Sequence, residues 1–447
     1  MISNYLTVLD IIPALLWFII LSVYVNTKAS KLENKELRPY FLRNFYIKIF
    51  YGIAFTLVYL IIYGGGDTIA YWDGAAVLNK LFFKSPSLYF EEITSAPSFE
   101  TGWIHYDSET GIPPDWIYRE SEGWFISQIT SILSFLTFRS LFATVIIYSY
   151  FVSIATWKIF ELVTKLNLHS LRVAALCMLY VPSVGFWCSG ISKDTLIYIS
   201  ILYILYYFLD ILILKSKVKL RHVIGILFFT FLMSQIRSFA LAATFAPLLA
   251  AFGTRLTNKY STNALAKFSF RILFIGVGAF GFLTFFSSSF VTELAQEASV
   301  IQSDFKNNES YSGKKYDIGV VDGTPIGMIR SFPISAFYGI YKPFIYESFS
   351  PTLILNGLES SLLLLMTLNF FFGGNVFKKI KRIRSNEFLI FAFVFVILIG
   401  FMAGYTSVLY GVLVRIRAPL LPFLFLILTS KPEEIIKPEE NLLPENK

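Results

Sequence analysis

Long apolar runs alternate with short, base-rich loops along the 447 residues of the chain. A helix needs roughly 20 apolar residues to span a bilayer, and eleven runs approach that length. They are residues 6–25, 45–63, 138–157, 171–187, 195–214, 223–236, 238–253, 269–287, 352–373, 387–405 and 410–430. The pattern therefore predicts an all-α polytopic membrane protein with about 11 transmembrane helices.

The loops between these runs predict the orientation of the chain. Lys and Arg near segment ends concentrate on the cytoplasmic side of a membrane. More than half of the 38 Lys and Arg residues lie in the loops 26–44, 158–172, 215–222, 254–271 and 378–384 and in the tail from Lys431. We therefore expect the N-terminus outside and the C-terminus inside.

Two long loops then lie on the external face, residues 64–137 and 288–351. The first ends in GWFISQITSILSFL, and the second contains GMIRSFPISAFYGIYKPFIY, which Pro333 and Pro343 interrupt. We expect both stretches to form re-entrant or interfacial helices. Residues 1–430 are expected to form a single transmembrane domain, and the charged, proline-rich residues 431–447 a disordered cytoplasmic tail.

The composition agrees with this architecture, since 55% of the residues are hydrophobic and only 15% are charged. Lipid can solvate such an apolar surface, which a soluble chain of this length cannot bury. The net charge of +8 comes from short clusters in loops, which argues against nucleic acid as a partner. Cys177 and Cys188 have neither a CxxC nor a His spacing, and the three His are scattered. No zinc-type metal site is therefore expected.

With this orientation, the unusual charges gather on the external side. Asp67 and Asp73 begin the first external loop, within YGGGDTIAYWDG. Other ionisable residues lie at external turns, in the second long loop or near the outer end of the last helix: Lys193, Asp194, Arg237, Arg330, Lys342, Glu347, Arg415 and Arg417. Ionisable groups at membrane depth are costly and tend to face a cavity or a substrate path. A shared outer-face cavity is the simplest common explanation.

Each candidate also has a purely structural explanation. Asp67 is suited to cap a helix that runs into the loop. Lys193 can extend to the headgroups while Ser192 or Asp194 caps the fifth helix, and Arg237 can bind a lipid phosphate. The residue pattern leaves both explanations open.

The same choice applies to the remaining candidates. Arg330 and Lys342 are also suited to anchor the second loop at the interface. The aromatic residues Tyr71, Trp72 and Trp187 are suited either to stack on a sugar or to form part of the aromatic belt found at membrane–water boundaries.

Arg415 and Arg417 are the hardest pair to explain as anchors. Arg415 lies sixteen residues before Lys431 at the inner edge, or about 24 Å along a helix at 1.5 Å per residue. In a hydrocarbon core about 30 Å thick, both guanidinium groups begin below the outer boundary. Pro419 removes the helical hydrogen bond to the carbonyl of Arg415. We therefore expect an unwound end that turns both arginines towards one anion.

The sequence G-D-T-x-x-Y-W after a membrane helix resembles the first external loop of GT-C-type integral-membrane glycosyltransferases. In that family an acidic motif of the D-E-x-Y-Y-W kind begins the loop and supplies the catalytic or metal-binding carboxylate. The resemblance implies Asp67 as that carboxylate, with Tyr71 and Trp72 as its aromatic neighbours. Thr68 stands where the family has its second acidic residue, so no cofactor is predicted and a divalent cation stays open.

Two later stretches also resemble known proteins. The R-x-R-x-P-x-x-P segment that begins at Arg415, and the FPISAFYGIYKPFIYE stretch, are similar to those of bacterial membrane proteins encoded with exopolysaccharide and O-antigen polymerases. The three stretches together cover a small part of the chain.

These observations predict an integral-membrane glycosyltransferase or polysaccharide polymerase at the external face of a bacterial inner membrane. Its partners would be a polyprenyl-(pyro)phosphate-linked sugar donor, a glycan acceptor and membrane lipid. Arginines at the interface suit the donor phosphate, and a carboxylate suits the role of general base on the acceptor hydroxyl. Asp67 is the first candidate for that base and Asp194 the second. The candidate substrate-binding residues are Tyr71, Trp72, Lys193, Arg237, Arg330, Lys342, Arg415 and Arg417.

The alternative is a transporter or flippase for a lipid-linked or anionic glycan. Such a protein would use the same arginines without a catalytic base. The first external loop distinguishes the two, because an enzyme is expected to fold it into a lid over Asp67.

Overall fold

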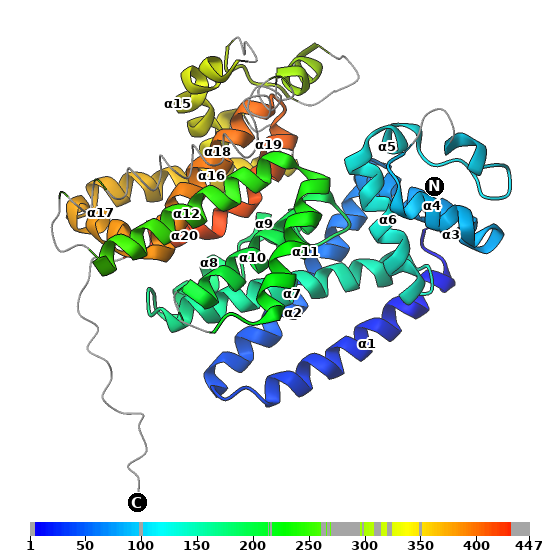
Figure 1. Cartoon of the computed structure of the whole chain (residues 1–447), viewed down its shortest axis with the longest axis horizontal. Helices are drawn as coiled ribbons and strands as arrows, with labels where there is room; N and C mark the ends of the chain where they lie inside the picture. Colours follow the sequence, from blue (N-terminus) through cyan, green and yellow to red (C-terminus); the bar gives the residue numbers. More distant parts are fainter. Residues whose placement is uncertain are drawn as a thin grey trace, which may run out of the picture. The chain divides into compact units, whose positions relative to one another are not determined.

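The structure is a computed structural model of the chain (Figure 1). It describes residues 5–97, 102–212, 214, 217–260, 265, 269, 296, 299–307, 314–319, 324–347 and 351–430. The predicted tail, residues 431–447, lies entirely outside the described residues.

Every regular element in the described part of the chain is a helix, apart from an isolated antiparallel bridge between Lys315 and Leu409. Eight helical stretches there are long and apolar enough to cross a membrane. They are Asp10–Ser30, Lys35–Ile62, Leu141–Lys165, Lys193–Leu212, Ser238–Thr257, Leu353–Phe372, Glu387–Thr406 and Tyr410–Leu428. The prediction of an all-α chain is confirmed, and the helices agree with a polytopic membrane protein.

Three of the eleven expected spans are not among these eight. Residues 171–187 do not form one helix, because α8 (Leu171–Met178) ends before Pro182, the first residue of α9 (Pro182–Trp187). Proline ends helices because it lacks an N–H and its ring clashes with the preceding turn. Residues 223–236 lie in α11 (Leu220–Ile236), which has only 17 residues. The expected span 269–287 falls outside the described residues, apart from Ser269.

Contacts divide the chain into two compact units. The first comprises Met1–Lys165, Ala174–Thr244 and Val414–Pro422. The second comprises Leu166–Val173, Phe245–Leu413 and Phe423–Lys447.

In the first unit, α2 (Arg38–Leu57) packs against α7 (Leu141–Lys165). The two helices approach closely because Gly52 has no side chain, and a Cβ there would collide with Ser149 on α7. Small residues allow such close approach where lipid gives helices no hydrophobic reason to associate. The helix α7 also contacts α1 (Val8–Ser30) and α10 (Lys193–Leu212).

The first external loop is itself helical and belongs to the first unit. It contains α3 (Asp67–Lys84), α4 (Pro86–Thr94), α5 (Asp115–Arg119) and α6 (Ser121–Leu136). The helix α3 packs against the other three. The expected helix in GWFISQITSILSFL corresponds to α6, so its helical state is confirmed.

In the second unit, α15 (Pro325–Tyr341) packs along α18 (Glu387–Thr406). A Cβ at Gly339 would collide with the backbone of Gly400, and one at Gly404 with the backbone of Ser335. The spacing of Gly400 and Gly404 is that of a G-x-x-x-G contact between membrane helices. Pro333 lies inside α15, so the expected interruption there is wrong.

The other helices of the second unit are α16 (Pro351–Phe372) and α17 (Val376–Ser385), and α20 (Leu421–Leu428) begins in the first unit and ends in the second. The helix α12 (Ser238–Tyr260) and the helix α19 (Tyr410–Arg417) each begin in one unit and end in the other.

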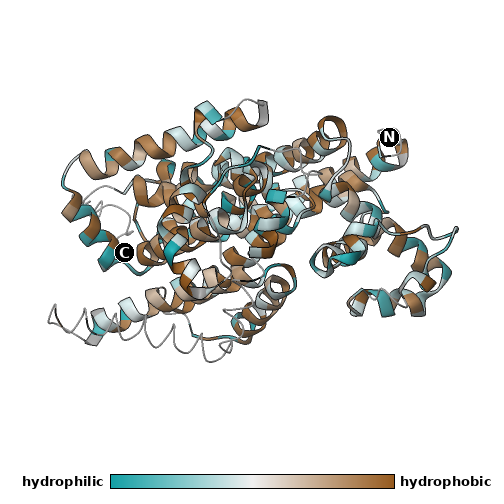
Figure 2. Cartoon of the chain, turned by 90° about the horizontal axis from the view of Figure 1, so that it is seen from above, coloured by the Kyte–Doolittle hydropathy of each residue, from teal (hydrophilic) through white to brown (hydrophobic). Residues whose placement is uncertain are grey.

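Hydrophobic residues, brown in Figure 2, make up much of the helices. Apolar side chains remain exposed along several of the spanning helices. On α1, Ile12 is 60% exposed, Leu15 56% and Ile19 58%. A soluble protein would bury such a stripe, whereas lipid solvates it. The described helices therefore have the surface of membrane-embedded elements.

Candidate functional site

Three consecutive glycines directly precede Asp67 and set the path of the chain into it. Gly64, Gly65 and Gly66 have φ values of 63°, 144° and 96°, a region that glycine enters without the penalty of a Cβ. They follow a π-helical stretch, Val58–Ile62, that ends α2. Single π-helical turns are frequent at functional sites. The glycines turn the chain directly into α3.

Asp67 is the first residue of α3 and not its cap. The cap residue is Gly66, and no side chain makes a capping hydrogen bond there. The proposal that Asp67 caps the helix is therefore wrong. A carboxylate in the first turn is nevertheless stabilised by the positive end of the helix dipole.

The helix α10 is capped by Ser192, one of the two residues suggested by the sequence. The Oγ of Ser192 accepts a hydrogen bond from the backbone N–H of Thr195 at 3.1 Å. Asp194, the second residue of α10, therefore has its carboxylate available for other partners. Its side chain is only 2% exposed.

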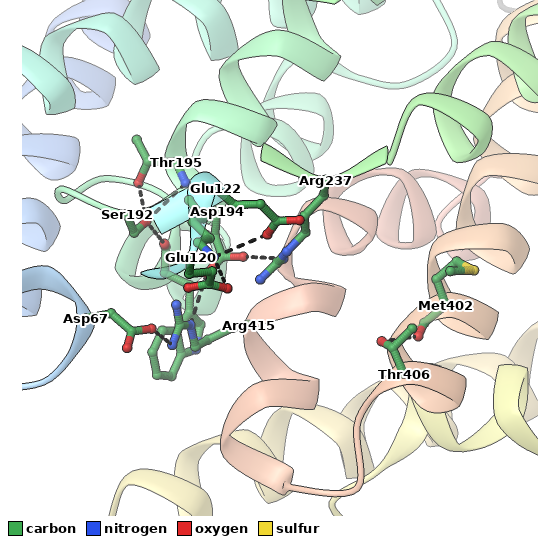
Figure 3. Close-up of polar contacts among 12 residues, drawn as sticks. Asp67, Glu120, Glu122, Ser192, Asp194, Thr195, Arg237, Met402, Thr406 and Arg415 are labelled. Atoms are coloured by element: carbon green, nitrogen blue, oxygen red, sulfur yellow. Dashed lines mark hydrogen bonds and ion pairs between the residues drawn. The ribbon is translucent and has the colours of Figure 1, made fainter. Parts of the chain in front are cut away.

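Two arginines bind the buried carboxylate of Asp194 (Figure 3). Nη1 of Arg237, at the turn between α11 and α12, lies 2.8 Å from Oδ1 of Asp194. Nε of Arg415, on α19, lies 3.0 Å from Oδ2. A buried charge is tolerated only where it is paired and hydrogen-bonded, and here each carboxylate oxygen has its own guanidinium.

Arg415 also reaches Asp67. Its Nη1 lies 2.9 Å from Oδ2 of Asp67, so one guanidinium bridges the first turns of α3 and α10. We call Asp67, Asp194, Arg237 and Arg415 the charge cluster. All four residues belong to the first unit, and the structure brings together four of the candidates expected from the sequence.

Aromatic side chains lie close to the charge cluster. The guanidinium carbon of Arg415 is 5.9 Å from the centre of the Trp187 ring, which is within the range of a cation–π contact. Tyr71 is 1% exposed. Burial, together with the negative charge of Asp67, raises the pKa of Tyr71 well above its ordinary value. Tyr71 therefore stays a neutral phenol.

Lys193 binds the first external loop. Its Nζ lies 2.7 Å from Oε1 of Glu120 and 3.2 Å from Oε2 of Glu122. Glu120 is the residue before α6, and Glu122 lies in the first turn of that helix. The side chain of Lys193 is 8% exposed, so it is a buried contact between α10 and the loop. The alternative in which it extends to the headgroups is wrong.

The two late arginines differ. The helix α19 is regular through Arg415 and Arg417, and the 3₁₀ turn at Ala418–Leu420 comes only after them. The expected unwound end is therefore wrong, because the chain tightens at Pro419 and not before it. Residues two apart on a helix point about 200° away from each other. Arg415 makes the contacts with the two aspartates, and Arg417 is fully buried.

Two other candidates, Arg330 and Lys342, lie in the second unit, whereas the charge cluster belongs to the first. Arg330 is exposed on α15. Nζ of Lys342 lies 2.6 Å from Oε1 of Glu347 and 4.4 Å from the centre of the Tyr338 ring. Trp72, in the first unit, is buried within α3 at 7% exposure.

Glu120 and Glu122 were not predicted as part of the site. Their signal in the sequence is the segment DWIYRESEGW, where carboxylates precede an apolar helix. Such loop carboxylates are usually solvated, and nothing in the sequence pairs them with a lysine more than 70 residues away.

The described residues include no group of three or more His, Cys, Asp or Glu side chains that could hold a metal ion. Comparison of the chain with protein-family models, with curated proteins and with solved structures gives no match.

Proposed function

We propose that the chain is an integral-membrane glycosyltransferase, or a polysaccharide polymerase of related mechanism. Its substrate would be a sugar donor linked to polyprenyl phosphate or pyrophosphate, used at the external face of a bacterial inner membrane. The observation that carries the proposal is the bond of Arg415 to both Asp67 and Asp194. It joins a guanidinium, which is suited to bind phosphate, and a carboxylate in one site.

The arginines are suited to the leaving group of such a donor. The polyprenyl tail stays in lipid while the phosphate lies at the interface, at the depth predicted for Arg415. Guanidinium groups bind phosphate through charge-assisted, often bidentate hydrogen bonds. They also stabilise the negative charge that grows on the phosphate as it leaves.

Asp67 is suited to activate the acceptor. In the proposed step, the proton of an acceptor hydroxyl moves to the carboxylate of Asp67. The acceptor oxygen forms a bond to the anomeric carbon of the donor. The bond from that carbon to the phosphate oxygen breaks, and its electron pair stays on the phosphate. General-base catalysis of this kind contributes about 10²–10⁴-fold in rate.

The first external loop supports an enzyme over a transporter. Glu120 and Glu122 fasten the start of α6 to Lys193, the residue next to Asp194. A folded loop beside the charges is what an enzyme needs to exclude water from the reaction. A transporter or flippase for a lipid-linked glycan remains the second candidate, because its anion would need the same arginines.

The release of polyprenyl phosphate separates the two functions. The purified chain in nanodiscs would be incubated with lipid-linked glycan intermediates extracted from cells that make the protein natively. Mass spectrometry would then follow the lipid products. An enzyme releases polyprenyl phosphate or pyrophosphate, and Asp67→Asn stops that release. A transporter moves its substrate unchanged, so a wild-type protein that releases none contradicts the proposal.

A further inference from the structure

Asp67 and Asp194 are bound to Arg415 in different ways. Asp194 is 2% exposed and uses both of its oxygens, one for each arginine. Asp67 is 34% exposed, and its bond to Arg415 uses Oδ2 alone. Asp194 therefore has the contacts of a permanent counter-charge, whereas Asp67 has those of a ligand that can exchange.

The charges of the cluster lead to the same distinction. Asp194 carries one negative charge and binds two arginines, so these three residues together retain one positive charge. A buried net charge is costly, and Asp67 supplies the negative charge that balances it. The two aspartates use two of the five N–H donors of Arg415. The two arginines and Asp194 thus form a site for one further anion, and the carboxylate of Asp67 occupies that site.

A phosphate fits the place of Asp67 better than a carboxylate does. It offers three or more acceptor oxygens and up to two negative charges, and the first turns of α3 and α10 both point their positive ends to this region. We propose that the phosphate of the donor displaces Asp67 from Arg415, so that donor binding itself releases the general base. This inference rests on the proposed function and adds its regulation.

Displacement would also set the order of the reaction. While Asp67 is bonded to Arg415, its Oδ2 accepts a hydrogen bond from the guanidinium and is not free to accept the proton of an acceptor hydroxyl. Once the phosphate has taken the guanidinium, the carboxylate of Asp67 is free to accept that proton beside the bound donor. The base is therefore released only when a donor is present.

The test is the binding of inorganic pyrophosphate to the full-length protein. The protein would be placed in nanodiscs of phosphatidylcholine, and binding would be measured by isothermal titration calorimetry. Asp67→Asn removes the competing charge, and we expect it to bind pyrophosphate about tenfold more tightly than wild type, which is about 1.4 kcal/mol. Asp67→Ser repeats the test with a smaller side chain if Asp67→Asn folds poorly.

Asp73→Asn is the matched control. Asp73 lies on the same helix, and its substitution removes the same single charge, but its carboxylate accepts a hydrogen bond from Tyr5 at 3.0 Å and not from an arginine. We expect this variant to bind as wild type does. The inference is overturned if Asp67→Asn and Asp67→Ser bind pyrophosphate no more tightly than Asp73→Asn, because the carboxylate and the anion then do not compete.

Two further arms identify the site and the source of the phosphate. The gain of Asp67→Asn should disappear in the double variant Asp67→Asn/Arg415→Lys, and a gain that persists places the anion elsewhere and overturns the inference. Titrations would also be repeated in nanodiscs that contain phosphatidylglycerol. Unchanged binding supports a donor phosphate, whereas loss of binding would assign the site to a lipid headgroup and overturn the inference.

The binding test needs no turnover, so its failure differs from failure of the proposed function. Glycan transfer without competition between Asp67 and pyrophosphate overturns the inference alone. Competition without any release of polyprenyl phosphate supports the anion exchange and contradicts the glycosyltransferase.

Discussion

Nε of Arg415 lies 3.0 Å from Oδ2 of Asp194, although 221 residues separate the two in the sequence. The contact joins α19 to the first turn of α10 in the interior of the first unit. Because Asp194 also binds Arg237, removal of this one carboxylate leaves two guanidinium groups without their main counter-charge.

We therefore expect Asp194→Ala to destabilise the protein strongly. Breaking a buried ion pair from one side costs about 3–5 kcal/mol, because the remaining charge is left uncompensated. The measurement is the thermal unfolding midpoint of the purified protein in detergent. Asp67→Ala should cost clearly less, since its carboxylate is 34% exposed and binds one arginine. Equal losses for both variants would contradict the different roles assigned to the two aspartates.

The helices could be predicted from the sequence because lipid imposes a length and a composition on each span. Eight of the described stretches lie where the apolar runs predicted them. The prediction of one helix over 171–187 is wrong, because the apolar composition of this run does not reveal the break before Pro182. Composition reports burial in lipid, but it does not report the path of the backbone.

The charge cluster could be predicted as a set of residues but not as a set of contacts. Asp67, Asp194, Arg237 and Arg415 all stood out because ionisable groups are rare in apolar surroundings. Their pairing depends on which helices pack together, and hydropathy carries no information on that. Arg330 and Lys342 stood out for the same reason, yet they belong to the second unit.

The predicted topology can be tested at exposed positions on both sides. Lys217→Cys and Asp317→Cys replace exposed residues, and an impermeant thiol reagent on intact spheroplasts should label position 317 but not position 217. The structure adds a constraint, since Arg415 bonds Asp67 and Asp194, and Asp194 bonds Arg237, so these residues must share one side of the membrane.

The native Cys177 and Cys188 are both buried, so the unmodified protein serves as the unlabelled control. Labelling at position 217 without labelling at position 317 would invert the orientation. The charge cluster would then face the cytoplasm, and a donor used at the external face would be excluded.

The contact between Lys342 and Glu347 predicts a dependence of stability on pH. Burial works to raise the pKa of Glu347, but hydrogen bonds from Lys342 and from the backbone N–H of Phe344 outweigh it and hold the pKa below its ordinary value. A carboxyl with a lowered pKa stabilises the folded state above its ordinary pKa, and that contribution is lost as the pH falls through the folded value.

Glu347→Gln should therefore lower the unfolding midpoint near neutral pH, and its difference from wild type should shrink as the pH falls below about 4.5. Thermal unfolding in detergent across this range measures the effect. Glu109→Gln removes a carboxylate that is 75% exposed and should leave the profile unchanged. A difference between Glu347→Gln and wild type that is constant with pH would show that the charge of Glu347 contributes nothing.

The last prediction separates the charge of Arg415 from its geometry. Its Nε and Nη1 bond two different carboxylates at 3.0 Å and 2.9 Å, and the single ammonium of lysine cannot reproduce this fork. Arg415→Lys keeps the charge and the length needed for membrane insertion, so the protein should accumulate normally. If Arg415 binds the donor phosphate, kcat should fall by about 100-fold, because the negative charge on the leaving group grows in the transition state. Arg384→Lys, at an exposed position on α17, is the matched control and should leave turnover unchanged. Donor titrations on both purified variants measure kcat and KM separately. If lysine at position 415 supports turnover as well as arginine does, the guanidinium acts only as an anchor for the last helix, and the proposed phosphate contact is wrong.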